Sequence, residues 1–186
     1  MEPVDLHILA ISGPEPVFDD VMTDFLRNTR DEFVSRSAQG GLLEHASLGL
    51  REPWLWRLTF HTRGLIRGVD GEVRPVERHV VALRFLPDYL RHVNKFQTLA
   101  LLEPRDVFHP NLRPPAICLN IEPGMSLLEI AESLHRLFSW QVRQLAENDA
   151  FNPDACAWGR AHLDELPTDK RRLFGRAVDF QLEEIA

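Results

Sequence analysis

The spacing of hydrophobic residues first predicts two amphipathic helices in this chain. In residues 17–37, apolar side chains recur near the 3.6-residue period of an α-helix, and acidic residues crowd the first turns, where they suit the positive end of the helix dipole. The glycines of segment 39–41 provide a stop. Residues 126–147 carry a second apolar stripe, with Gln141 as its single polar member and a Ser-x-x-Glu capping box at 126–129.

Between the two helices, the pattern changes to one typical of β-strands. Residues 54–62 alternate with period two and have one strongly apolar face, on which Trp54 and Trp56 are predicted to fill the sheet core rather than to form a ligand platform. Asp70-Gly71 is a favoured hairpin pair. Further strands are predicted at residues 42–50, 78–85 and 95–103. Because each connection is short, we expect an antiparallel meander of about four strands.

A proline-rich segment and a C-terminal tail complete the pattern. Residues 104–125 hold five prolines and should be irregular, which places Cys118 in a long loop. Residues 148–155 break the second helix, and Pro167 interrupts a tail, 156–186, that contains one or two shorter helices. The order helix, four strands, Cys-bearing loop, central helix and C-terminal helices predicts an α+β fold, with helices on one face and one end of the sheet.

Length and composition are those of one ordinary globular domain. With 186 residues, 44% of them hydrophobic, we expect a single domain over 1–186, with a core of about 17–160 and a helical tail at 161–186. The net charge of −7 argues against a nucleic-acid partner. No stretch nears the roughly 20 apolar residues that span a membrane, and the N-terminus lacks the basic start of a signal peptide, so a cytoplasmic location is expected.

The cysteines and histidines do not form a recognisable metal motif. Cys118 and Cys156 make neither a disulfide framework nor a CxxC pair, and the eight histidines are scattered. We therefore expect no metal and no cofactor. Cys156 is predicted to be a packed small residue. Cys118 is either a nucleophile or an inert buried thiol, a common fate of free cysteines, and its loop setting favours the nucleophile.

The stretch around Cys118, HPNLRPPAICLNI, resembles the active-site segment of ubiquitin-conjugating (E2) enzymes, which carry a His-Pro-Asn triplet, a short spacer and Ile-Cys-Leu. The predicted order of elements is also that of the E2 family. Residues 85–90, FLPDYL, stand where the family has its Phe-Pro…Tyr-Pro turn, and residues 147–155 resemble its Asn-Asp-Pro segment after the second helix. The resemblance covers roughly residues 17–160 and implies a UBC-like fold.

This resemblance implies a transferase whose cysteine carries a thioester. Cys118 would accept a ubiquitin-like protein from an E1-like activating enzyme and pass it to an amine of a protein substrate. Asn111 would donate to the oxyanion or hold the loop in shape, His109 would support the loop rather than act as a base, and Asp149 would orient the acceptor amine. For Asp149 the alternative is a helix-ending turn without a catalytic role.

Three departures from the family pattern bear on partners. The spacer LRPPAI has two prolines and no glycine, residues 91–95 replace the family's proline pair, and the tryptophan usually found after the cysteine is absent. The last two lie on surfaces that the family uses to bind RING-type ligases, which argues against such a ligase. The divergent, arginine-rich sequence resembles bacterial E2-like proteins encoded beside E1-like and ubiquitin-like genes in antiphage operons, which implies antiviral defence.

Two other functions remain open. A catalytically inactive E2-variant or RWD-type binding module would keep only the fold, although such modules usually lack the cysteine. A cysteine hydrolase that uses Cys118 and His109 would need a third, orienting residue and an oxyanion hole at a helix N-terminus. A cysteine in a proline-rich loop does not match that geometry well.

Lysine is scarce in this chain, which has 19 arginines but only Lys95 and Lys170. Codon bias in a GC-rich genome would account for the ratio. A second hypothesis is that an enzyme whose thioester reacts with amines avoids modifying itself. Lys95 then remains the obvious self-acceptor, because it lies in the segment after the third predicted strand.

Overall fold

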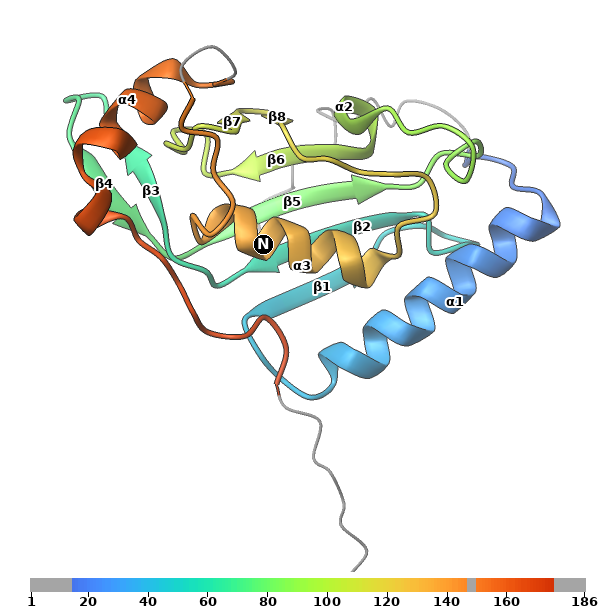
Figure 1. Ribbon diagram of the computed structural model, residues 1–186. Coiled ribbons are helices and arrows are strands. Elements are labelled where there is room, and N and C mark those ends of the chain that lie inside the picture. The colour runs from blue at the N-terminus through green and yellow to red at the C-terminus, as the bar shows by residue number, and fades with distance from the viewer. Residues whose placement is uncertain (1–14, 147–149, 176–186) are drawn as a thin grey trace, which may run out of the picture.

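The computed structural model describes residues 15–146 and 150–175, and within these ranges the chain forms an α+β fold with four α-helices and a four-stranded antiparallel sheet (Figure 1). The helices are α1 (Asp20–Ser37), α2 (Lys95–Thr98), α3 (Leu127–Phe138) and α4 (Pro153–Ala161). The sheet has the order β1 (Leu43–Ser47), β2 (Leu55–Phe60), β5 (His79–Arg84) and β6 (Leu99–Glu103). The predicted α+β class and four-stranded meander are therefore confirmed.

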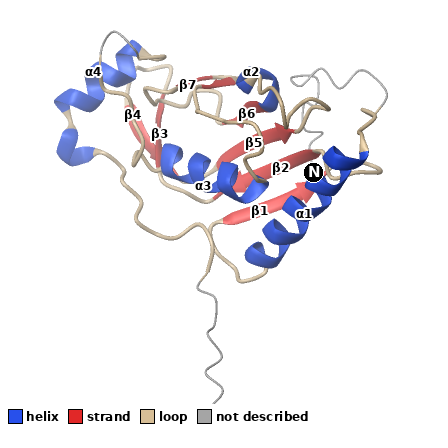
Figure 2. Cartoon of the chain, turned by 45° about the vertical axis from the view of Figure 1, so that its right-hand side comes forward, coloured by secondary structure: helices blue, strands red, loops and turns tan. Residues whose placement is uncertain are grey.

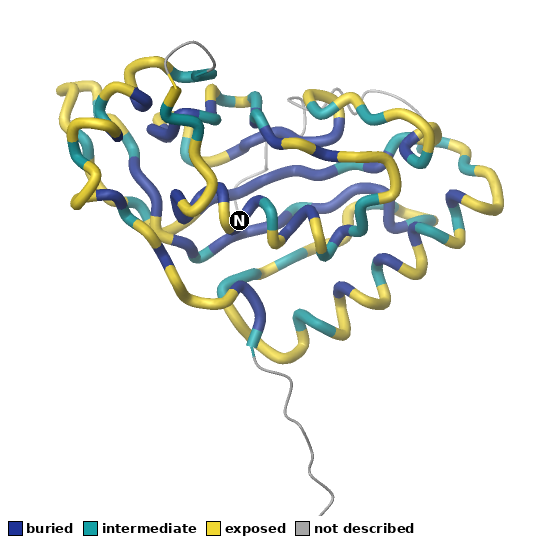
Figure 3. Tube along the Cα trace, viewed as in Figure 1, coloured by how far each residue is buried: buried dark blue, intermediate teal, exposed yellow. Residues whose placement is uncertain are grey.

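Helices α1 and α3 cover the same face of this sheet (Figure 2). Trp56 and Phe60 point to one side of β2, because alternate side chains of a strand share a face. Phe33 of α1 meets Trp56 with ring centroids 5.6 Å apart, and Phe138 of α3 meets Phe60 at 5.3 Å. The chain is buried along β2 and β5 (Figure 3), and Trp54 and Trp56 lie in the core as predicted.

Local chemistry explains both ends of α1. The Asp19 carboxylate accepts a hydrogen bond from the N–H of Met22 at 2.8 Å, so this N-cap starts the helix three residues later than predicted. Beyond the helix, Gly41 has a φ of 140°, and a Cβ there would lie 2.1 Å from the Leu173 carbonyl oxygen. Only glycine allows this close approach. Helix α1 ends at Ser37, just before this segment, so the predicted stop at 39–41 is confirmed.

A small hairpin occupies the connection between β2 and β5. Strands β3 (Gly64–Arg67) and β4 (Val73–Val76) pair antiparallel, and Asp70-Gly71 lies at their tip, where Gly71 has a φ of 82°. The predicted turn is confirmed, but it closes this separate hairpin rather than joining two strands of the main sheet.

The segment that leads into β6 begins as a helix. Residues 95–103 were predicted to be a strand throughout, which is wrong for the first four residues. The Asn94 side chain accepts a hydrogen bond from the N–H of Phe96 at 3.2 Å, and the Thr98 hydroxyl donates to the Asn94 carbonyl at 3.0 Å. These bonds hold one helical turn, α2, before the strand starts at Leu99.

Helix α3 ends at Phe138, not at residue 147 as predicted. The N–H of Gln141 donates to the Arg136 carbonyl and the N–H of Trp140 to the Leu137 carbonyl, both at 3.0 Å, which is the Schellman pattern. Trp140 stands at the left-handed position with a φ of 57°, an unusual conformation for a bulky residue. Its fully buried indole stabilises this termination through packing.

The C-terminal part of the described chain includes one predicted helix. Helix α4 lies at the end of the sheet beside the β3–β4 hairpin (Figure 1), where Trp158 meets Phe108 with centroids 6.1 Å apart. A short 3₁₀ turn (Leu163–Glu165) follows, and the chain then returns to the sheet. Residues 170–175 are not helical, and the rest of the second predicted helix lies outside the described residues. None of the helices in the described ranges is long and apolar enough to cross a membrane.

Candidate functional site

A short hairpin, whose two strands have two residues each, brings Asn111 and Cys118 together. Strands β7 (Leu112–Arg113) and β8 (Ala116–Ile117) pair across a turn at Pro114-Pro115, and the N–H of Cys118 donates to the Asn111 carbonyl at 2.8 Å. The expectation that residues 104–125 are wholly irregular is therefore wrong. The two prolines lie at the turn, where their missing N–H groups break no ladder bond.

Burial and one further bond hold this hairpin in place. The side chains of Leu112 and Ile117 are fully buried in the main core. The N–H of Leu101 in β6 donates to the Pro115 carbonyl at 2.8 Å, so the hairpin is tied to the sheet. Cys118 leaves the hairpin at a defined position, and its side chain is only partly buried.

Cys118 opens into a hollow of about 660 Å³ that is rich in positive charge. Of the described residues, three basic ones, Lys95, Arg136 and Arg143, line it, as does one acidic residue, Glu122. The Lys95 ammonium nitrogen, Nζ, lies 3.8 Å from the Cys118 sulfur. Such an environment favours negative charge that develops in the hollow during a reaction.

Asn111 has one engaged and one available side-chain group. Its Oδ1 accepts a hydrogen bond from the backbone N–H of Gln144 at 3.0 Å. Because an N–H can only donate, this bond fixes which end of the amide is the oxygen. Among the described residues the Nδ2 group has no hydrogen-bond partner, and Asn111 lines the same hollow as Cys118.

His109 is buried beneath this site. Its Nδ1 accepts a hydrogen bond from the N–H of Asn111 at 3.0 Å, and its ring stands edge-on to Trp140 at 4.7 Å. Burial lowers the pKa of His109 to about 3, and the nearby His79 and Arg143 act in the same direction. An imidazole with this pKa is neutral and a weak base at pH 7.

Asp149, the predicted residue for the acceptor amine, lies outside the described residues. The chain that resumes at residue 150 lies beside the site. The N–H of Asn152 donates to the Pro110 carbonyl at 2.8 Å, and Phe151 stacks against Phe96 with ring centroids 6.3 Å apart. Cys156 is buried in α4, where its thiol contacts the Leu145 carbonyl at 2.9 Å.

Sequence reasoning missed the contribution of Arg136, Arg143 and Gln144. A helix that continued to residue 147, as predicted, would carry Arg143 and Gln144 onward along a regular spiral, whereas Arg136 lies within the observed α3. The chain instead leaves α3 at Ser139, and its next residues form one wall of the hollow. Gln141, the polar member of the apolar stripe, was the one sign that the helix had already ended.

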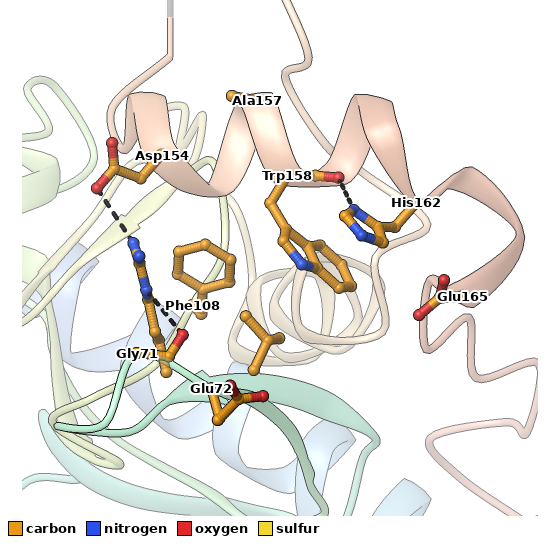
Figure 4. A pocket seen from close by; sticks show the side chains of 10 residues that line it. Gly71, Glu72, Phe108, Asp154, Ala157, Trp158, His162 and Glu165 are labelled. Carbon is orange, nitrogen blue, oxygen red and sulfur yellow. Dashed lines mark hydrogen bonds and ion pairs between the residues drawn. The ribbon is translucent and has the colours of Figure 1, made fainter.

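A second hollow, of about 510 Å³, lies between α4 and the β3–β4 hairpin (Figure 4). Trp158 and His162 stack there with ring centroids 4.3 Å apart, and Arg67 pairs with Asp154 at 3.3 Å. Its lining contains no cysteine, serine, threonine or lysine, so it is less suited to covalent chemistry. Within the described ranges, no three His, Cys, Asp or Glu residues are grouped so that they could hold a metal ion.

No protein-family model fits this sequence, and no curated protein is significantly similar to it.

Proposed function

We propose that this chain is an E2-like transferase with a UBC-like fold. It accepts a ubiquitin-like protein from an E1-like enzyme as a thioester on Cys118 and transfers it to an amine of a target protein. The observation that carries the proposal is the pairing of Asn111 and Cys118 across the β7–β8 hairpin, at a hollow that exposes the thiol. The element order and the His-Pro-Asn triplet support it.

The chemistry requires two acyl transfers and no cofactor. The Cys118 sulfur attacks the thioester carbonyl on the E1-like enzyme, whose own thiolate leaves. An acceptor amine then attacks the new thioester, and the Cys118 thiolate leaves. Each step develops negative charge on a carbonyl oxygen. The Nδ2 group of Asn111, which has no partner among the described residues, and the side chain of Arg143 are suited to stabilise that charge.

In this proposal His109 has a structural role. It accepts the N–H of Asn111, and that bond sets the backbone from which the Asn111 side chain projects. The incoming acyl group is already activated as a thioester, so the first step does not depend on a permanent histidine base.

The proposed partners follow from the reaction: an E1-like enzyme, a ubiquitin-like modifier and a protein substrate. A setting in a bacterial antiviral conjugation system, in the cytoplasm and without a RING-type ligase, belongs to the same proposal. It rests on the resemblance and on the altered segments at 91–95 and after Cys118.

Two observations weigh against the alternatives. A binding module with an inert cysteine does not need a partly exposed thiol in a hollow with a lysine and two arginines. A cysteine hydrolase needs a base in contact with the nucleophile, whereas the Nδ1 of His109 is bonded to the Asn111 N–H and its pKa is about 3.

The test is a charging assay with ATP and any E1-like and ubiquitin-like proteins that the genes beside this one encode. We expect an adduct that reductant removes and that Cys118→Ala abolishes, whereas Cys118→Ser gives an ester that survives reductant but not alkali. Cys156→Ser is the matched control and should charge normally. If the E1-like enzyme loads itself but no adduct forms on the wild-type chain, the proposal fails.

A further inference from the structure

We propose that Lys95 is a built-in acceptor, which takes the acyl group from Cys118 in the same molecule and thereby closes the site. This inference rests on the proposed thioester at Cys118. The Lys95 amine belongs to α2 and the Cys118 thiol to the residue that follows β8, and their Nζ and Sγ atoms lie 3.8 Å apart.

The separation suits acyl transfer. The carbonyl carbon of a thioester is bonded directly to the sulfur, so a nitrogen near the sulfur is also near the carbon that it must attack. Reacting atoms in productive complexes are about 3–3.5 Å apart, which rotation of the Lys95 and Cys118 side chains can provide. Lys95 lies in the wall of the hollow where an acyl group on Cys118 would sit.

The backbone that carries Lys95 is fixed. Lys95 is the first residue of α2, whose turn is held by the Asn94 cap on Phe96 and by the Thr98 hydroxyl on the Asn94 carbonyl. The Lys95 ammonium lies 5.4 Å from the centre of the Phe96 ring. A reactant that is already positioned gains greatly in effective concentration over a free amine in solution.

The step balances without another reactant. The Lys95 ammonium gives one proton to water, and its nitrogen attacks the thioester carbonyl. The nitrogen then loses a second proton to solvent, and the carbon–sulfur bond breaks to leave the new carbon–nitrogen bond. The leaving Cys118 thiolate takes up a proton from solvent. The products are a free thiol and an amide on Lys95.

The chain provides its own control, because it has only one other lysine. Lys170 lines a different hollow, together with Arg36 and Phe174, and Cys118 is not part of that lining. Scarcity of lysine elsewhere makes self-modification selective for Lys95. An amide at this position tethers the modifier in front of the thiol, so a modified enzyme should not be charged again.

The experiment charges the purified chain with the E1-like enzyme and modifier, stops the E1 step and follows the thioester without added acceptor. The reductant-sensitive band is read first: its absence in the wild type contradicts the proposed function, whereas its presence makes the Lys95 test valid. We expect it to give way to a reductant-resistant adduct that peptide mass spectrometry locates at Lys95.

Three variants decide the inference. Lys95→Arg keeps the positive charge of the hollow. Its thioester band is measured first, and from that thioester the resistant adduct should form at least about tenfold more slowly than in the wild type. Lys170→Arg should behave as the wild type, and Cys118→Ala should give no adduct. A resistant adduct that forms equally fast in Lys95→Arg, or that lies on Lys170 or the terminal amine, overturns the inference. So does a Lys95-modified enzyme that accepts a second modifier on Cys118.

Discussion

Asn111 has two polar side-chain groups with separable roles. Asn111→Asp keeps an oxygen for the Gln144 N–H but removes the Nδ2 donor and adds negative charge to the hollow. We expect discharge of the Cys118 thioester to an added amine to fall about 100–1000-fold, the usual loss for one oxyanion donor. Single-turnover discharge, followed on non-reducing gels, measures this effect.

Two further variants separate donor loss from charge and from folding. Asn120 lines the same hollow, so Asn120→Asp adds the same charge without touching Asn111, and should retain most of the activity. Asn111→Ala loses both groups and should also unfold about 1 kcal/mol more easily. Normal discharge by Asn111→Asp would show that this residue only anchors the loop.

Buried histidines make this chain less stable in mild acid. Burial lowers the pKa of His79 to about 4 and that of His109 to about 3, and it also lowers the pKa values of His45 and His135. An unfolded histidine gains its proton near pH 6.5. Below pH 6.5 the unfolded state therefore binds more protons than the folded state. The contribution of these histidines to stability is complete above that pH and is lost as the pH falls toward 4.

We expect the free energy of unfolding to be roughly 2–4 kcal/mol lower at pH 5 than at pH 7.5, since one pKa unit corresponds to about 1.4 kcal/mol. Urea unfolding at the two pH values measures the difference. In His79→Gln the difference should shrink by about half, whereas His92→Gln, which removes an exposed histidine, should leave it unchanged. An equal difference in all three proteins would contradict the assignment.

Helices α1 and α3 are joined by a single buried hydrogen bond. The Thr29 hydroxyl accepts the N–H of Leu127 at 2.6 Å, and both residues are buried. Leu127 is the first residue of α3, whose N–H has no partner within the helix. A side chain of α1 thus supplies the acceptor for an N–H group that α3 itself leaves without a partner.

Thr29→Val should therefore lower the free energy of unfolding by about 1–3 kcal/mol, because it strands a buried N–H while keeping the side chain's shape. Thr29→Ser retains the oxygen and should lose less. The midpoint and slope of urea unfolding give both values. If Thr29→Val and Thr29→Ser lower the free energy of unfolding equally, the loss comes from changed packing, and the hydrogen bond to Leu127 contributes nothing.

The elements that sequence could predict are those whose pattern is local. The periodicity of residues 17–37 and 54–62 is enough to give α1 and β2, because neighbouring side chains decide which face is buried. The end of α3 could not be predicted, since Trp140 adopts a positive φ only because its ring is held in the core. The helical turn at Lys95–Thr98 depends on a side-chain cap that competes with a strand pattern.

The candidate site also contains residues that a local motif predicts and residues that only the tertiary structure brings there. Cys118, Asn111 and His109 belong to one contiguous sequence motif, and their proximity follows from a hairpin of a few residues. Arg143 and Gln144 reach the hollow only because α3 stops early. The short distance between Lys95 and Cys118 depends on α2, which a strand over 95–103 would not produce.

The segment that follows α4 connects the C-terminal part of the described chain to the edge of the main sheet. Residues 166–174 run back to the edge of the sheet, where the Leu173 carbonyl accepts the N–H of Leu42 at 2.8 Å and Phe174 forms a bridge with Gly41. The Arg171 carbonyl lies 2.9 Å from the Nε2 of His135 in α3. These contacts join the C-terminal segment to the β1 edge and to a helix on the main face, and the bridge partly covers an otherwise open strand edge.

Phe174 is the anchor of this closure, since its buried ring meets that of Phe33 with centroids 6.1 Å apart. Phe174→Ala should lower the free energy of unfolding by about 3–5 kcal/mol through the cavity that it leaves. At about 2–4 °C per kcal/mol for a chain of this size, the thermal midpoint should fall by roughly 6–20 °C.

Two control variants separate the cavity from other effects. Phe174→Leu fills most of the space and should lose much less stability. Leu163→Ala, at an exposed position of the 3₁₀ turn, should change little. Scanning calorimetry compares the three variants. A Phe174→Ala midpoint equal to that of Leu163→Ala would mean that the C-terminal segment lies on the core without stabilising it, whereas the expected order makes this segment part of the folding unit that supports Cys118.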